Sequence, residues 1–195
     1  MNYEPRLSRD LIPEIFRSYS TRTFFDRCIE CDIFLLDMDK EIPYFIEKAI
    51  KKYEGLRGHD VIFEYAICTT CAENIRKRLS KESVRSMSEY FSRNADLRKR
   101  NKILEAHPDN PEVWTDTCLI KGVHKDEIQE YQIYAQCIHD RLLLPEMPYM
   151  LSHAALDDMV NLLSDKTLGE MDDFIGKHFG PPAEVTTGPR NIVLV

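Results

Sequence analysis

Two Cys-x-x-Cys pairs are the sequence feature that most restricts the fold of this chain. Cys28 and Cys31 form the first pair, and Cys68 and Cys71 form the second after 36 intervening residues. A Cys-x-x-Cys turn lets two thiolates reach one ion, and four sulfur ligands suit the closed tetrahedral coordination of structural zinc. The sequence therefore predicts one structural Zn²⁺ ion with no open position for an activated water.

The residues around the cysteines predict a hairpin followed by a helix. Residues 44–50 and 61–67 are rich in β-branched and aromatic side chains, and Gly55 and Gly58 lie between them. Cys68 and Cys71 stand where the second strand changes to the helical pattern CTTCAENIRKRL. Backbone N–H groups and the positive end of the helix would stabilise thiolate charge there.

This order of elements resembles the treble-clef group of zinc fingers. In that group a cysteine turn and a hairpin precede a helix whose first turn supplies the last two ligands, and the resemblance covers about residues 25–79. Three other interpretations of the cysteines stay open: a thioredoxin-like redox pair, an iron–sulfur cluster, and buried thiols without a metal. The redox interpretation leaves Cys28 and Cys31 unexplained.

The second half of the chain resembles a worn copy of the first. An offset of 84 positions aligns residues 65–94 with residues 149–178 without a gap and matches the apolar positions. In this alignment Ser152 and Ala155 stand opposite Cys68 and Cys71, and Cys118 lies roughly where the first cysteine turn began. We therefore predict a degenerate second copy that has lost its metal. The alternative is that two amphipathic helices share a pattern by chance.

The remaining ligand-type residues predict no second metal site, because their spacing fits no familiar finger. They are Cys118, His124, Cys137, His139 and His153.

These patterns predict an α+β fold in two related halves. Residues 1–106 would hold an N-terminal helix at 10–18 and the zinc-binding half, residues 112–180 the degenerate half, and residues 181–195 a C-terminal tail. The last five residues, 191–195, are apolar enough to add a strand to a sheet edge, and a frayed tail is the alternative.

Length, charge and targeting signals set the broad class. The chain has 195 residues and a formal net charge of −7, which opposes a whole-surface attraction to nucleic acid or anionic membrane. It shows neither an apolar signal region nor a membrane-length apolar run, and no glycine spacing typical of a phosphate loop. We therefore expect a cytoplasmic protein without a membrane partner.

One segment departs from the net acidity. Residues 76–102 carry ten basic and three acidic residues. A basic helix after a zinc finger can lie along phosphates, so a nucleic-acid-binding regulator is the alternative function, with Arg76, Arg78, Lys81 and Arg85 as its contacts. The favoured interpretation is a solvated helix face that complements the acidic half of the same chain.

No catalytic motif is recognisable. Some treble-clef proteins are nucleases, but they need a histidine near the hairpin, and His59 is the one candidate. We therefore predict a non-catalytic protein that binds structural zinc and another protein. A thiol redox protein and a treble-clef nuclease remain weaker alternatives.

Overall fold

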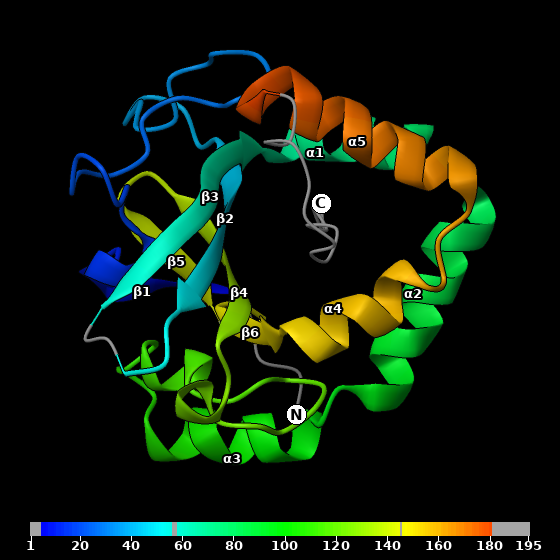
Figure 1. Ribbon diagram of the computed structural model, residues 1–195. Coiled ribbons are helices and arrows are strands. Elements are labelled where there is room, and N and C mark those ends of the chain that lie inside the picture. The colour runs from blue at the N-terminus through cyan, green and yellow to red at the C-terminus, as the bar shows by residue number, and fades with distance from the viewer. Residues whose placement is uncertain (1–4, 56–57, 145, 181–195) are drawn as a thin grey trace.

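Six strands form a single sheet in which every bonded pair is antiparallel (Figure 1). The computed structural model describes residues 5–55, 58–144 and 146–180. The strands are β1 (Arg6–Leu11), β2 (Pro43–Lys52), β3 (His59–Cys68), β4 (Glu130–Ile138), β5 (Arg141–Leu144) and β6 (Tyr149–Ser152). Their order is β1-β5-β4-β2-β3, and β6 pairs with β4. Together with the helices, this sheet confirms the predicted α+β class.

The predicted hairpin is confirmed by β2 and β3. Their register runs from Tyr44 opposite Cys68 to Lys52 opposite His59. Gly55 has a φ of +77° in the connecting turn, a conformation that strains residues with a Cβ atom. The hairpin thus delivers Cys68 to the end of β3, beside the start of a helix.

Both halves of the chain contribute to the same sheet. β2 and β4 pair from Pro43 opposite Ile138 to Lys51 opposite Glu130, and β1 pairs with β5. Ile46 and Ile133 are almost fully buried at this seam. The expected ranges 1–106 and 112–180 therefore meet in the middle of one sheet.

The predicted N-terminal helix over residues 10–18 is wrong. Arg6–Leu11 form strand β1, and within residues 10–18 only Glu14–Phe16 make a short 3-10 helix, η1. Pro13 has no N–H to donate, and Ile12 donates its N–H to the carbonyl of Asp140 instead of to a helical partner. Pairing with β5 outweighs the weak local helical pattern.

The basic segment 76–102 is not one helix. It spans α1 (Thr69–Arg78), α2 (Lys81–Asn94) and part of α3 (Leu97–Ala106). Ser80 and Asp96 separate these helices. Each is the N-cap of the helix that follows it, because its side chain accepts the N–H of Ser83 or of Lys99, respectively.

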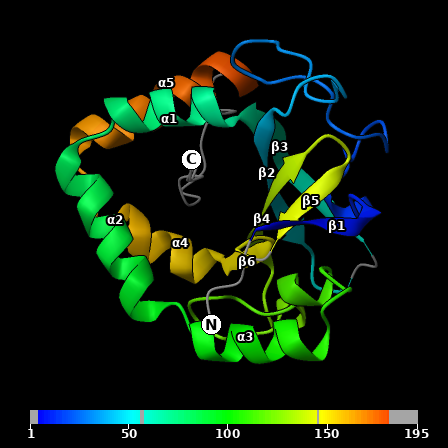
Figure 2. The same cartoon turned by 180° about the vertical axis from the view of Figure 1, so that it is seen from behind.

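The second half ends in two helices, α4 (His153–Val160) and α5 (Asp165–Phe179). Figures 1 and 2 show α1 and α5 side by side, with α2 and α4 continuing the arch that faces the sheet. Short 3-10 helices, η2 (Val113–Thr115) and η3 (Lys125–Glu127), lie in the connection between α3 and β4.

Four hydroxyl side chains join the two helix pairs where each pair bends. Ser80 caps α2 by accepting the N–H of Ser83, and Ser164 caps α5 by accepting the N–H of Thr167. The bonds also cross between the halves, because the N–H of Ser80 donates to Thr167 Oγ1 at 3.0 Å and the N–H of Ser164 donates to Ser83 Oγ at 2.9 Å. Each half therefore supplies the hydroxyl that accepts the N–H of the other half's capping serine.

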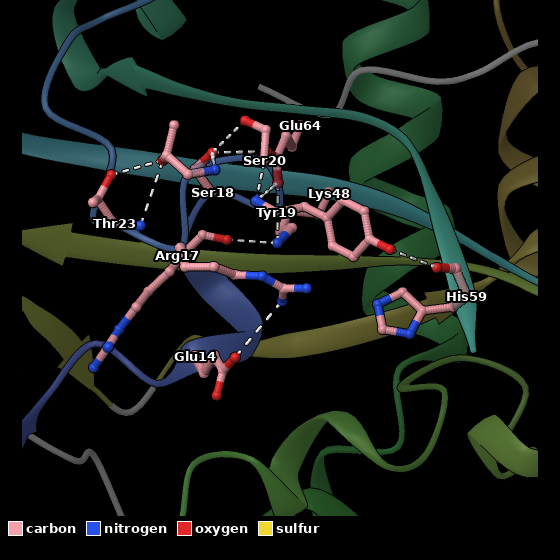
Figure 3. Close-up of polar contacts among 11 residues, drawn as sticks. Glu14, Arg17, Ser18, Tyr19, Ser20, Thr23, Lys48, His59 and Glu64 are labelled. Carbon is pink, nitrogen blue, oxygen red and sulfur yellow. Dashed lines mark hydrogen bonds and ion pairs between the residues drawn. The ribbon is translucent and has the colours of Figure 1, made fainter. Parts of the chain in front are cut away.

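A buried ion pair fastens the N-terminal segment to the hairpin (Figure 3). Lys48 Nζ lies 3.0 Å from Glu64 and donates to the carbonyl of Arg17 at 2.7 Å. Glu64 also accepts the N–H of Tyr19 at 2.7 Å and the hydroxyl of Ser18. Burial lowers the pKa of Lys48, and Glu64 opposes this shift. These contacts hold the chain that leads into the first cysteine turn.

Candidate metal centre

Cys28 and Cys31 lie in a tight turn closed by its own backbone. Cys28 donates its N–H to the carbonyl of Ile33 at 3.0 Å, and Asp32 donates to the carbonyl of Cys28 at 2.9 Å. Asp32 has a φ of 57°, which Asp tolerates better than most residues do. The Sγ atoms of this pair lie within 4.8 Å of each other and of those of Cys68 and Cys71.

Cys68 and Cys71 come from the junction between β3 and α1. Cys68 is the last residue of β3 and the N-cap of α1, and Cys71 lies in the first helical turn. Ile29 donates its N–H to the carbonyl of Ala66 at 2.9 Å, which seats the cysteine turn against the end of β3. The structure thus brings together all four cysteines predicted from the sequence.

The geometry fits a tetrahedral metal with four sulfur ligands. All four Sγ atoms lie within 4.8 Å of one another, and those of Cys31 and Cys68 are 3.9 Å apart. A tetrahedron with metal–sulfur bonds of about 2.3 Å has edges of roughly 3.8 Å. The cluster could therefore hold a metal ion.

The thiols of the cluster differ in their electrostatic surroundings. Burial raises the pKa of Cys28, but the N–H groups of Cys68, Cys31 and Glu30 outweigh it and leave the pKa lowered. Burial and the neighbouring sulfurs raise the pKa of Cys71 well above its ordinary value. Four adjacent thiolates repel one another, so a bound cation is what would let all four deprotonate.

The cluster lies at the protein surface rather than deep in the core. Cys28 and Cys68 are buried, Cys71 is partly exposed and Cys31 is exposed. A metal here would be reached by solvent on the Cys31 side while its coordination stays filled by protein.

A contact that the sequence did not reveal joins the cysteine turn to the end of α5. Glu30 accepts Lys177 Nζ at 2.6 Å and His178 Nε2 at 2.9 Å. Burial raises the pKa of Glu30, but the hydrogen bonds from Lys177 and His178 outweigh it and lower the pKa. No local pattern signals this contact, because almost 150 residues separate the partners.

The other ligand-type residues do not assemble a second centre. Cys118 and Cys137 are both buried. Burial raises the pKa of Cys137, whose thiol lies beside the hydroxyl of Tyr44. Within residues 5–55, 58–144 and 146–180, the four-cysteine group is the one set of three or more metal-ligating side chains close enough to hold an ion.

The basic residues of the nucleic-acid alternative divide between two roles. Arg78 Nε lies 2.9 Å from Glu170 of α5, and Arg85 is 4.0 Å from Glu89 on its own helix. Arg76 and Lys81 are exposed. Arg100 is buried and donates to the carbonyls of Pro148 and Glu146. Part of the basic segment thus serves contacts within the chain.

An apolar cavity of about 400 Å³ lies between the sheet and the arch of helices. Its lining includes four methionines, Met87, Met147, Met159 and Met171, and Arg76 is a charged group on its wall. The sequence did not reveal this cavity, because its walls come from six separate helices and strands.

In the described part of the chain, no helix is both long and apolar enough to cross a membrane. Comparison of the chain with protein-family models, with curated proteins and with solved structures finds no match.

Proposed function

We propose that Cys28, Cys31, Cys68 and Cys71 bind one structural Zn²⁺ ion in a non-catalytic protein that binds another protein. The observation that carries the metal assignment is the cluster of four Sγ atoms within 4.8 Å of one another. Zinc suits four sulfur ligands in a closed tetrahedral site, and it would cross-link the cysteine turn to α1. Metal binding would then contribute directly to the stability of the fold.

The arrangement around the cluster supports a treble-clef-like unit. A cysteine turn precedes the β2–β3 hairpin, and α1 begins at the end of β3, with Cys68 as its N-cap and Cys71 in its first turn. This is the order in which the treble-clef group places its ligands, as the sequence resemblance implies.

The second half supports a duplication of this unit. A turn at residues 117–124 precedes β4, β5 and β6, and α4 then begins directly after β6. The aligned Ser80 and Ser164 cap corresponding helices, α2 and α5. We infer that the chain contains one unit used twice, with the metal kept in the first.

We assign the binding of a protein partner to the loop after Cys31. Three apolar side chains on this loop are exposed, Ile33 at 39%, Phe34 at 42% and Met38 at 72%, while Leu35 is fully buried and anchors the loop. Exposed apolar side chains on an anchored loop are typical of protein-binding surfaces.

Metal analysis tests the zinc assignment. Purified protein should contain one zinc ion per chain, and cobalt(II) should replace it with the absorption of a tetrahedral thiolate site. Iron in place of zinc, or purified folded protein without metal, would overturn the assignment.

Photo-cross-linking tests the protein-binding loop. A photo-cross-linking residue at Met38 should capture one defined protein, whereas the same residue at exposed Leu97 should not.

Nucleic-acid binding is the second candidate, favoured by the exposed Arg76 and Lys81 on adjoining helices. Binding to a labelled DNA or RNA duplex at low salt, lost in Arg78→Glu/Lys81→Glu/Arg85→Glu with the fold intact, would support it. Failure to bind at low salt would remove it.

A further inference from the structure

The turn at residues 117–124 repeats the backbone contacts of the metal-site turn. Cys118 donates its N–H to Val123 at 2.8 Å, and Gly122 donates to Cys118 at 2.9 Å. Leu119 donates to Met150 at 2.9 Å, as Ile29 donates to Ala66 in the first turn. These bonds place Cys118 where the first turn has Cys28.

The sulfur of Cys118 also has the same kind of partner as its counterpart. The N–H of Ser152 donates to Cys118 Sγ at 3.2 Å, and the N–H of Cys68 donates to Cys28 Sγ at 3.4 Å. Ser152 therefore occupies the position of Cys68. Counting along the turn and the helix then places Lys121 at the position of Cys31 and Ala155 at the position of Cys71.

The hydroxyl of Ser152 is unexplained by the fold alone. Ser152 is 1% exposed, and its Oγ has no hydrogen-bond partner within the described part of the chain. A buried hydroxyl without a partner costs free energy, so a side chain that packs without hydrogen bonds would suit this position better. A cysteine here would instead be satisfied by the metal that its sulfur binds.

An ion pair joins the turn to the helix where a metal would otherwise do so. Lys121 Nζ lies 2.5 Å from Asp158 Oδ2, and Asp158 is on α4, three residues after Ala155. The hydroxyl of Tyr90, on α2, donates to the same oxygen at 2.6 Å. The hydrogen bonds from Lys121 and Tyr90 lower the pKa of Asp158, which keeps it ionised.

We propose that the second turn is a former metal site in which the Lys121–Asp158 ion pair has replaced the metal as the cross-link between turn and helix. The site keeps the shape of a zinc site, so cysteines at positions 121, 152 and 155 would complete a four-sulfur site with Cys118. This inference rests on the proposed duplication.

The test is the zinc content of the full chain carrying Lys121→Cys/Ser152→Cys/Ala155→Cys. We expect one more zinc ion per chain than in the wild type, and a second thiolate–cobalt(II) absorption of equal strength. The matched control adds Cys118→Ser to the same three substitutions and should lose the additional ion. A folded triple variant with the wild-type zinc content would overturn the proposal.

The same experiment separates this proposal from the first zinc site. The three substitutions are also made with Cys31→Ser and Cys71→Ser, which remove two ligands of the first cluster. Zinc bound to this variant belongs to the second turn alone, whatever the wild type binds.

Native contacts give a second test that does not require the triple variant to fold. Lys121→Met and Asp158→Asn should each lower the unfolding midpoint, and the double variant should lower it by less than their sum. Additive effects would overturn the cross-link.

Ser152→Ala tests the buried hydroxyl. This variant should leave the unfolding midpoint unchanged or raise it, and a clear fall would show that the hydroxyl has a role of its own.

Discussion

At the scale of single residues, the four clustered cysteines have unequal surroundings. Backbone N–H groups surround the Cys28 sulfur and lower its pKa, whereas burial among other sulfurs raises the pKa of Cys71. Cys28 thus deprotonates more easily than Cys71, whose deprotonation a bound cation would favour.

Replacing Cys71 by Ser should remove the metal. The variant loses one of four ligands, and we expect zinc affinity to fall by more than about 100-fold, beyond the effect of changing a residue that only orients a ligand. Competition with a chromophoric chelator measures the change. Cys137→Ser, which changes a buried thiol outside the four-cysteine group, is the control and should keep one zinc ion.

His59 should make stability depend on pH. Partial burial and then the positive charges of Lys48 and Arg22 lower the pKa of His59, whose ring lies beside Tyr19 (Figure 3). The unfolded chain therefore binds more protons than the folded chain just below pH 6.5, and stability falls as the pH drops through that range.

Urea unfolding of the wild type and of His59→Gln at pH 7.5 and 6.0 measures this effect. We expect the wild type to lose more stability between the two pH values than the variant does. Equal losses would exclude His59 as the source.

At the scale of helices and strands, the two capped bends are the points where the halves depend on each other. Ser83 and Thr167 are fully buried, and each accepts an N–H from the other half. Each of these buried hydroxyl groups needs a hydrogen-bond partner, and the partners are other members of the same network. Losing one hydroxyl therefore affects both bends.

Ser164→Ala should destabilise the protein by about 1–2 kcal/mol, because it removes the cap of α5 and a partner of Ser83. Chemical denaturation measures the difference. Ser88→Ala is the control, since the exposed Ser88 hydroxyl donates to the carbonyl of Val84 on its own helix, and its effect should stay within about 0.5 kcal/mol.

The contact between Glu30 and α5 should hold the last turn of that helix in place. Glu30→Gln keeps the shape of the side chain but removes the charge that pairs with Lys177 and His178. We expect faster hydrogen exchange at residues 174–179 with unchanged zinc content. Asp172→Asn, an exposed change on the same helix, should leave exchange unchanged.

The sequence predicts the elements that have strong local signals. The hairpin is evident because its strands are rich in β-branched and aromatic residues, and the start of α1 is evident from the helical pattern that begins at Cys68. β1 is missed because its pairing partner, β5, lies about 130 residues later, and the strand itself has little apolar periodicity. The cysteines of the site are predictable from their spacing, whereas Glu30, Lys177 and His178 meet only in three dimensions.

At the scale of the whole molecule, the sheet makes the two halves one folding unit. β2 and β4 share a continuous ladder, and the edge strand β1 of the first half pairs with the second half. The stability contributed by a metal in the first half is then available to the entire chain.

Chelation should accordingly lower a single unfolding transition. Trp114 is 5% exposed and lies where the two halves meet, because its Nε1 donates to the carbonyl of His107 and the guanidinium of Arg100, on α3, lies over its ring. Its fluorescence therefore reports on this boundary. After treatment with a chelator, we expect the Trp114 transition and the far-ultraviolet dichroism transition to move down together. A Trp114 transition that stays in place would mean that the region around the cysteines unfolds without the boundary between the halves.

Because β2 and β4 pair directly, the connection at residues 107–112 is not needed to hold the two halves in place. This connection is mostly exposed, and the halves on either side of it are held by paired strands and shared helix caps. A chain nicked there would remain a non-covalent complex of two fragments, much as two subunits remain a dimer. The covalent link then acts by keeping the partners at high local concentration, while recognition between the halves lies in the sheet.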